Sequence, residues 1–335
     1  MRDLATFANA LSENRPLEQR AAYACDHIDI PQCISYFVAM ALISSGDHGH
    51  KNYYLYRDTR ASGEWALLPW DVDLSWGRNW RGEYFNETIF VDNPLTSYRA
   101  GHDKGRNRLY NLFFEYPEFR QMYLRRLRTV MDELLQPPGT PPRSLIIEKR
   151  VRELMDLLDP PEFKQTDAAL DDAAWPSWGR RGSMRSEAQR VIDEYLPGRR
   201  NFLFKSSRAK LLGDPIPAAQ PSDVTLQFRE IESRCAAAEQ FVCITNQNNL
   251  AVDVTGWRLA GAGIEHRFRP GTVIPAGNAI YTVADVNRFR HRSAGPSGGQ
   301  SLLAQGNWKG ALQRGPGNLQ LSDAKGRIVG SAALR

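Results

Sequence analysis

The polar segment DHGHKN, residues 47–52, places a carboxylate, two imidazoles, an amine and an amide within one short loop. Two further carboxylates, Asp71 and Asp73, follow in the sequence PWDVD. Carboxylate and amide oxygens are the ligands that hard cations such as Mg²⁺ prefer in proteins. The residue types therefore indicate a site for a hard metal ion.

A β-hairpin is predicted to bring these two groups together. Residues 52–58 (NYYLYRD) and 65–76 (WALLPWDVDLSW) read as strands, and the intervening TRASGE is typical of a turn. One polar group precedes the first strand and the other lies at the end of the second. Because a hairpin returns the chain to its starting point, the two groups should be neighbours. The near-continuous apolar segment 31–45 predicts a buried helix behind the loop.

The spacing of Asp47 and Asn52 suits phosphoryl transfer from ATP. Protein kinases use an Asp that accepts the hydroxyl proton in the pattern Asp-x-x-x-x-Asn, and the Asn and a second Asp hold magnesium. Asp47 and Asn52 have this spacing, and Asp71 lies at the equivalent place beyond the hairpin. The spacing alone is common by chance, and the hairpin that ends in Asp-x-Asp makes the pattern more specific.

Other interpretations of the same residues stay open. Asp47 also suits a plain turn that ends a helix. The pair His48 and His50, with the carboxylates at 71 and 73, would suit zinc in a metal-dependent hydrolase, although His in a loop is more often a surface residue. On a strand, Asp71 and Asp73 would point to opposite faces, and at most one would face a metal unless the strand ends at Trp70; Asp71 is favoured as the ligand. Four tryptophans are predicted to pack in the core, and a platform for a sugar is the alternative: Trp65, Trp70, Trp76 and Trp80.

The chain up to about residue 210 resembles the C-terminal part of the CotH family, the atypical kinases related to the spore-coat protein kinase. The matching segments are SSGDHGHKNYYLYRD, GEWALLPWDVDLSWG, YPEFRQMYLRRLRTVMDELL and EYLPGRRNFLF. The resemblance implies transfer of the ATP γ-phosphate to a Ser or Thr of a protein substrate, with Mg²⁺ or Mn²⁺ as the cofactor.

The resemblance also implies roles for the matching residues. Asp47 corresponds to the catalytic Asp, and Asn52 and Asp71 would bind the magnesium ion. Asp73 would be a further ligand or would orient the others. Three more candidates lie in the same segment: Lys51 for binding ATP, and His48 and His50.

A kinase of this type also needs an N-terminal lobe with a Gly-rich loop and a Lys that pairs with the phosphates. Only 46 residues precede Asp47, they look helical, and none of them forms a Gly-rich loop. The chain is therefore expected to be a kinase C-lobe that works within a longer chain or with a separate N-lobe. The alternative is a truncated or inactive kinase fold that acts as a binding module.

Composition divides the 335 residues into two domains of an α+β protein. Residues 1–212 are predicted to form a mainly helical, kinase-C-lobe-like domain around the hairpin, and the Pro-rich segment 213–223 a linker. Short strands separated by Gly, Pro and Asn fill residues 224–335 and predict an all-β sandwich. This part resembles the lamin-tail domain, an immunoglobulin-like sandwich, through DVTGW at 253–257, PGTVIPAG at 270–277 and LQLSDAKG at 319–326.

The second domain is expected to attach the protein to an envelope or extracellular component. The net charge is +5, with the excess in residues 222–335, and NRFRHR at 287–292 would suit an anionic polymer. The loop 101–108 is expected to be solvated. No apolar run is long enough to span a membrane, and no nucleic-acid motif is present, so neither partner is predicted. No signal peptide is visible, and a secreted or envelope-associated location is favoured.

The cysteines give a weaker indication. Cys25, Cys33, Cys235 and Cys243 form two pairs whose spacing is too wide for a typical zinc site. The second pair would suit a disulfide across a hairpin in an oxidising compartment, and four free buried thiols are the alternative.

Overall fold

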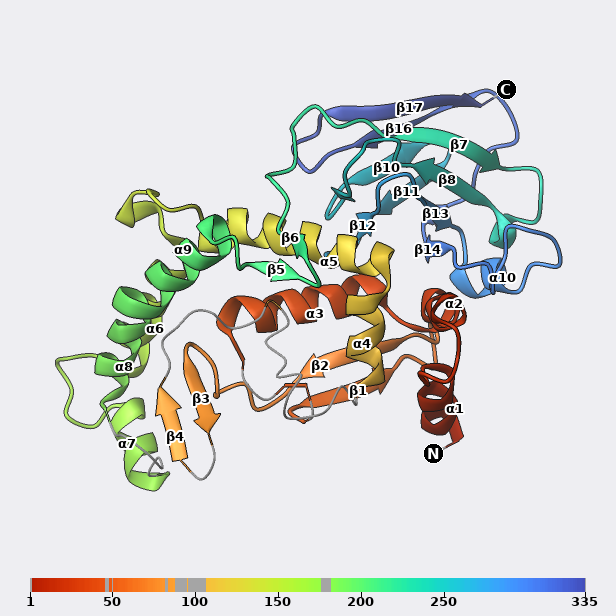
Figure 1. The fold of residues 1–335 in the computed structure, drawn as a ribbon. Helices are drawn as coiled ribbons and strands as arrows, with labels where there is room; N and C mark the ends of the chain where they lie inside the picture. Colours follow the sequence, from red (N-terminus) through yellow and green to blue (C-terminus); the bar gives the residue numbers. More distant parts are fainter. Residues whose placement is uncertain are drawn as a thin grey trace.

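The computed structural model describes residues 2–45, 48–49, 51–81, 84–87, 95, 107–175 and 182–334. Within these residues the fold is α+β, with a helical N-terminal region and a β-rich C-terminal region (Figure 1). Asp47 and His50 lie outside the described residues, as does most of the predicted loop 101–108. Their predicted roles therefore stay predictions.

Helices make up most of the N-terminal region. Those before residue 47 are α1 (Arg2–Ala10), α2 (Leu17–His27) and α3 (Ile30–Ile43). Those after it are α4 (Arg108–Glu115), α5 (Pro117–Val130), α6 (Ile146–Leu158), α7 (Asp167–Ala174), α8 (Met184–Arg190) and α9 (Leu196–Lys205). Shorter helical segments are the π-helical Met131–Leu135 and Val191–Tyr195 and the 3-10 turn Pro142–Ser144. Two hairpins lie between α3 and α4: β1 (Tyr53–Arg57) with β2 (Trp65–Pro69), and β3 (Arg78–Arg81) with β4 (Tyr84–Glu87).

Helix α3 lies at the centre of this region. The Asp29 carboxylate caps its start by accepting a 3.2 Å hydrogen bond from the Gln32 amide, and Pro31 suits the first turn. Ten of its 14 residues are buried. The helix stops at Ser44, whose φ of 51° is left-handed and cannot continue the helix. The predicted buried helix behind the loop is confirmed.

The predicted hairpin is also confirmed. Strands β1 and β2 are antiparallel, with Tyr53 opposite Pro69 and Arg57 opposite Trp65. Leu67 on β2 is fully buried beneath the hairpin, in the core that includes α3. The second strand is shorter than predicted, because the backbone leaves the extended conformation at Asp71, whose φ is 51°.

The C-terminal region contains two main sheets. One has the order β15 (Lys309–Gly310), β11 (Ile264–Arg267), β10 (Arg258–Gly261), β16 (Gly317–Ser322) and β17 (Ile328–Leu334). The other has the order β14 (Leu303–Gln305), β13 (Ala279–Val283), β8 (Phe241–Thr245) and β7 (Gln227–Glu232). Shorter elements are the strand pairs β5 (Lys210–Leu211) with β6 (Asp214–Pro215) and β9 (Val252–Asp253) with β12 (Val273–Ile274), the 3-10 turn Ala237–Glu239, and helix α10 (Val286–Arg290).

Both sheets contribute to one buried cluster, which contains Ile244 of one sheet and Leu259 and Leu319 of the other. Side chains alternate along β8, so Phe241 points the opposite way, into a second cluster with Phe289 of α10. The described residues therefore form two sheets around a shared core, with a helix on the outer face of one sheet. The finer resemblance to a lamin-tail sandwich stays a prediction.

The predicted linker, residues 213–223, lies against α5. Arg120 forms a 2.6 Å ion pair with Asp214, and Arg125 and Arg128 donate to the carbonyls of Ala218 (2.8 Å) and Pro217 (3.1 Å). On the same helix, Arg126 forms a 3.1 Å ion pair with Asp253 of β9, and both side chains are almost fully buried. Helix α5 thus holds the connecting segment and the C-terminal region together.

The basic segment 287–292 is partly used inside the protein. The Arg290 side chain is buried and forms a 2.6 Å ion pair with Glu64. Arg292 lies 4.9 Å from the ring centre of Phe241 and donates to the Glu239 carbonyl. Arg290 and Arg292, which were predicted to bind an anionic partner, therefore contact other parts of the same chain instead.

All four cysteines are free thiols, so the proposed hairpin disulfide is not formed in this structure. Among the described residues, no helix is both long enough and apolar enough to cross a membrane.

Candidate functional site

The open end of the β1–β2 hairpin brings Asn52 next to the segment that carries Asp71. The Trp70 amide donates a 3.3 Å hydrogen bond to the Asn52 carbonyl. Both Asn52 (φ 63°) and Asp71 (φ 51°) have left-handed backbones, a conformation that Asn and Asp tolerate better than most residues. The prediction that the hairpin makes the two polar groups neighbours is confirmed for Asn52 and Asp71.

The chain after Asp71 turns back to the end of α3. The Ser75 amide donates to the Asp73 carbonyl (2.8 Å), and the Trp76 amide donates to the Ile43 carbonyl (2.7 Å). Asp71 and Asp73 are both exposed and lie beyond the end of the strand. Strand alternation therefore does not separate the two carboxylates, because the strand ends before Asp71.

Side chains from the second half of the N-terminal region hold the last carbonyls of α3. The Tyr195 hydroxyl lies 2.8 Å from the Leu42 carbonyl and 2.9 Å from the Ser44 hydroxyl, and the Arg199 guanidinium donates to the Ala41 carbonyl. A cation at this end of a helix also interacts favourably with the helix dipole. Arg199 is fully buried, and burial lowers its pKa. These contacts fix the point where the chain leaves α3 toward residue 47.

His48 is fully buried, so the expectation that it lies on the surface is wrong. Its Nδ1 lies 2.7 Å from the Tyr110 hydroxyl, and that hydroxyl lies 3.0 Å from the His48 carbonyl. Burial raises the pKa of Tyr110 well above its usual value, so the phenol is neutral at physiological pH. A single side chain of α4 thus holds the residue that follows Asp47.

Asn107 holds the next residue of the loop. Its Nδ2 donates to the Gly49 carbonyl (2.7 Å) and lies 3.3 Å from the Tyr53 hydroxyl, while its Oδ1 accepts from the Tyr110 amide and caps α4. The sequence analysis missed this role and placed Asn107 in a solvated loop. The available signal was an Asn directly before the helical pattern RLYNLFF, which is typical of an N-cap.

The described part of the loop therefore has a rigid frame. Ser45 and His48, which flank residues 46–47, are both buried, whereas Lys51 is exposed and Asn52 is half-buried. Within the described residues, no group of three or more His, Cys, Asp or Glu side chains could hold a metal ion. Because His50 lies outside those residues, the zinc hypothesis stays untested.

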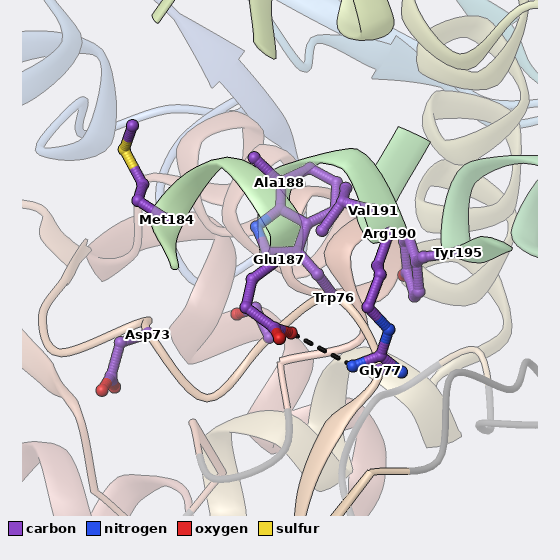
Figure 2. Close-up of a pocket in the computed structure, with 10 residues that line it drawn as sticks. Asp73, Trp76, Gly77, Met184, Glu187, Ala188, Arg190, Val191 and Tyr195 are labelled. Atoms are coloured by element: carbon purple, nitrogen blue, oxygen red, sulfur yellow. Dashed lines mark hydrogen bonds and ion pairs between the residues drawn. The ribbon is translucent and has the colours of Figure 1, made fainter. Parts of the chain in front are cut away.

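A pocket of about 270 Å³ lies beside the loop that follows Asp71. Its walls include Asp73 and Trp76 on one side and residues of α8 on the other, among them Glu187 and Arg190, which form a 3.1 Å ion pair (Figure 2). Trp76 packs edge-to-face on Tyr195, with ring centres 5.5 Å apart. The pocket is partly apolar, lies next to the candidate site, and is large enough to hold a side chain of another molecule.

The tryptophans near the site have different environments. Trp65 is buried and Trp76 is partly buried, as predicted. Trp70 is 58% exposed and packs only its edge on the exposed Tyr54, with ring centres 5.3 Å apart, so its assignment to the core is wrong. Nothing is described of the Trp80 side chain.

Comparison with known proteins finds one family and one curated relative that match this chain. The family model described as "CotH kinase protein" matches residues 1–203. The Inner spore coat protein H of Bacillus subtilis (strain 168) is 26% identical over 156 residues, which cover 45% of this chain and 38% of that protein. The match thus spans less than two thirds of this relative's length. Because the family match covers more than half of the chain, the chain belongs to the CotH kinase protein family.

Proposed function

We propose that the protein is a CotH-type protein kinase lobe that transfers the ATP γ-phosphate to a Ser or Thr hydroxyl of a protein, with Mg²⁺ or Mn²⁺ as cofactor. One observation carries the proposal. The hairpin places Asn52, at the start of β1, beside the Trp70–Asp71 segment that follows β2. These are the two residue types that hold magnesium against the phosphates in protein kinases.

The residues fit a hard cation in chemical type. The side chains of Asn52 and Asp71 offer amide and carboxylate oxygens, and Asp73 adds a second exposed carboxylate close by in the chain. Neither aspartate is buried, so a nucleotide could reach both. A bound Mg²⁺ would neutralise part of the phosphate charge during transfer.

The protein supplies the remaining groups. Asp47 is proposed to accept the proton of the substrate hydroxyl, and Lys51, which is exposed, to contact the nucleotide. Asn107 and Tyr110 hold Gly49 and His48, the described residues that follow Asp47 in the chain.

The C-terminal region is proposed to contribute to attachment. The curated relative is a spore coat protein, which suggests an association with a coat or envelope for this chain as well. The protein substrate and the envelope partner are part of the proposal.

Two substitutions separate the proposed roles in a test. Calorimetry with ATP and Mg²⁺ should show binding to the intact chain that Asp71→Asn abolishes, because the variant loses a charged metal ligand. Asp47→Asn should still bind Mg-ATP but lose transfer of radiolabelled γ-phosphate to protein, because only proton acceptance is removed. Asp171→Asn, on the exposed face of α7, is the matched control and should change neither measurement.

The outcomes decide between a kinase and a binding module. Absence of Mg-dependent ATP binding even when an N-lobe is supplied to the intact chain would contradict the proposal and favour an inactive kinase fold. Binding that survives Asp71→Asn would contradict the assigned metal ligand. Loss of binding in Asp47→Asn would show that Asp47 does not act as the proton acceptor alone.

A further inference from the structure

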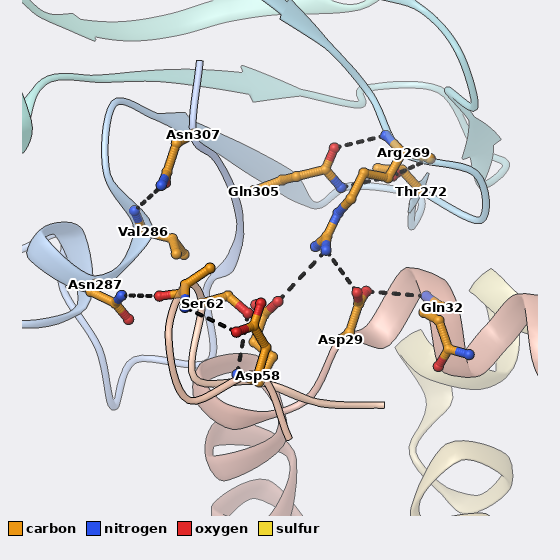
Figure 3. Close-up of polar contacts among 12 residues, drawn as sticks. Asp29, Gln32, Asp58, Ser62, Arg269, Thr272, Val286, Asn287, Gln305 and Asn307 are labelled. Carbon is orange, nitrogen blue, oxygen red and sulfur yellow. Dashed lines mark hydrogen bonds and ion pairs between the residues drawn. The ribbon is translucent and has the colours of Figure 1, made fainter. Parts of the chain in front are cut away.

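Two arginines of the C-terminal region form ion pairs with residues at the start of α3 and β2, the elements that lead to the candidate site. Arg269 Nη1 lies 2.7 Å from the Asp29 carboxylate, which is also the N-cap of α3 (Figure 3). The same nitrogen lies 3.7 Å from Glu64, the residue directly before β2. One guanidinium therefore faces the first residues of both α3 and β2.

Arg290 holds the hairpin from α10. Its Nη2 lies 2.6 Å from Glu64 and 3.1 Å from the Cys25 carbonyl, and its Nη1 lies 3.3 Å from the Ser62 carbonyl in the hairpin turn. Only 7% of the Arg290 side chain and 5% of the Glu64 side chain are exposed. Asn287, on the same helix as Arg290, donates to the Ala61 carbonyl (2.6 Å; Figure 3). Two adjacent carbonyls of the hairpin turn, those of Ala61 and Ser62, therefore accept hydrogen bonds from side chains of α10.

Hydrogen bonds also join α3 and β2 to each other. The Leu67 amide donates to Gln32 Oε1 (2.9 Å), and Gln32 Nε2 donates back to the Leu67 carbonyl. The Asp29 amide donates to the Trp65 carbonyl (2.9 Å). Helix α3 and strand β2 therefore form one stiff unit, because both side-chain and backbone hydrogen bonds join them.

The other ends of this unit lead to the candidate site. Helix α3 runs from the Asp29 cap to Ser44, three positions before Asp47, and β2 runs from Glu64 to Pro69, two positions before Asp71. A tilt of α3 at Asp29, or of β2 at Glu64, would displace the opposite end of that element, because helices and paired strands move as rigid elements. The two arginines can therefore affect the geometry of the candidate site indirectly, through α3 and β2.

We infer that Arg269 and Arg290 are positioning residues for phosphoryl transfer, acting through Asp29 and Glu64 on the ends of α3 and β2 that carry Asp47 and Asp71. This inference rests on the proposed function. The C-terminal region then has a second role besides attachment, since it sets the geometry of the catalytic and metal-binding groups from a distance.

The test combines amide hydrogen exchange with Mg-ATP binding in the full-length chain. Arg290→Gln and the milder Arg269→Gln should increase exchange roughly tenfold at the far ends, in peptides covering 40–53 and 66–74. They should weaken Mg-ATP binding by roughly three- to thirtyfold. Arg290→Lys should restore part of both, because it keeps the charge that faces Glu64. The control is Arg258→Gln, which removes an ion pair of 2.8 Å to Glu265 on the half-exposed surface of β10 and β11.

Exchange that changes only next to the substitutions, near residues 26–32 and 58–66, would overturn the inference, as would equal far-end changes in Arg258→Gln. A melting curve for each variant guards against simple unfolding, and Arg269→Gln is the variant of choice if Arg290→Gln does not fold. If the wild-type chain does not bind Mg-ATP even when an N-lobe is supplied, the proposed function fails. The exchange data still decide whether these arginines position residues 40–53 and 66–74.

Discussion

The Nδ1 atom of His48 lies 2.7 Å from the hydroxyl oxygen of Tyr110, and neither side chain is exposed. Because the same hydroxyl lies 3.0 Å from the His48 carbonyl, it can donate to that carbonyl while it accepts from a protonated Nδ1. One phenol thus contacts both the backbone carbonyl and the Nδ1 atom of the residue after Asp47. The candidate loop depends on α4 for its conformation.

Tyr110→Phe should therefore lower the free energy of unfolding by about 1–3 kcal/mol, because it removes hydrogen bonds to buried polar groups. Urea denaturation measures this change, and hydrogen exchange should rise at residues 44–49. Tyr54→Phe is the matched control: its ring lies on the exposed face of the hairpin, and its effect should stay within about 0.5 kcal/mol. Equal losses in the two variants would show that the Tyr110 hydroxyl contributes nothing specific.

Asn107 allows two functions of one side chain to be separated. Asn107→Asp keeps the oxygen that caps α4 but loses the Nδ2 donor to the Gly49 carbonyl, whereas Asn107→Ala loses both. The Ala variant should lose about 1–2 kcal/mol of stability from the cap. Hydrogen exchange should rise at residues 48–53 in both variants, but at residues 108–112 only in the Ala variant. Exchange at 48–53 that stays slow in Asn107→Asp would exclude Asn107 as the anchor of Gly49.

Local patterns in the sequence were sufficient to predict the elements of the site. A near-continuous apolar segment predicted α3, and strand and turn residues predicted the hairpin, whose closure brings Asn52 beside the Trp70–Asp71 segment. In the C-terminal region, Gly256 (φ 72°) in the segment DVTGW provides the turn before the buried Trp257. These features depend on residues close together in the chain, so spacing alone carries the information.

Contacts between distant segments were not predictable in the same way. The buried Arg199 and Tyr195 that hold the end of α3 have no local signal, because Arg in a helical segment reads as a surface residue. The basic segment 287–292 looked like a surface for anions, yet Arg290 is paired with Glu64 across the two regions. Only the fold shows which charged side chains form ion pairs with each other. A run of charged residues in a sequence can therefore suggest an external partner when those residues are paired inside the protein.

The two regions meet at Gly271, and this contact leaves no room for a side chain. A Cβ at Gly271 would lie 2.1 Å from the Pro31 carbonyl oxygen and 2.4 Å from the Ser35 hydroxyl, at the start of α3. Gly271→Ala should therefore cost roughly 3 kcal/mol, from the left-handed backbone (φ 86°) and the steric clash together.

Gly277→Ala measures the cost of the left-handed backbone without the cost of the steric clash. Gly277 has a similar φ of 72°, but no atom lies within 4 Å of the position that its Cβ would occupy, so this variant should cost only about 1–2 kcal/mol. Thermal or urea unfolding of both variants measures the difference. If the two substitutions were equally costly, the close approach of Gly271 to α3 would not contribute to stability.

The last prediction concerns pH. Burial lowers the pKa of His266, whose Nε2 lies 3.1 Å from Gln305 Oε1, and the nearby Arg269 acts in the same direction. The unfolded chain therefore binds a proton on this residue at a higher pH than the folded protein does. Its contribution to stability is present above the ordinary His pKa of about 6.5 and is lost as the pH falls toward the lowered value.

The free energy of unfolding should therefore decrease below pH 6.5, by at most about 1.4 kcal/mol per pH unit for this group. His266→Gln should flatten the decrease measured by urea titrations between pH 7 and pH 5. His27, whose pKa burial also lowers, keeps part of the slope in both proteins. A slope that is the same in wild type and His266→Gln would mean that His266 is protonated equally in the folded and unfolded states.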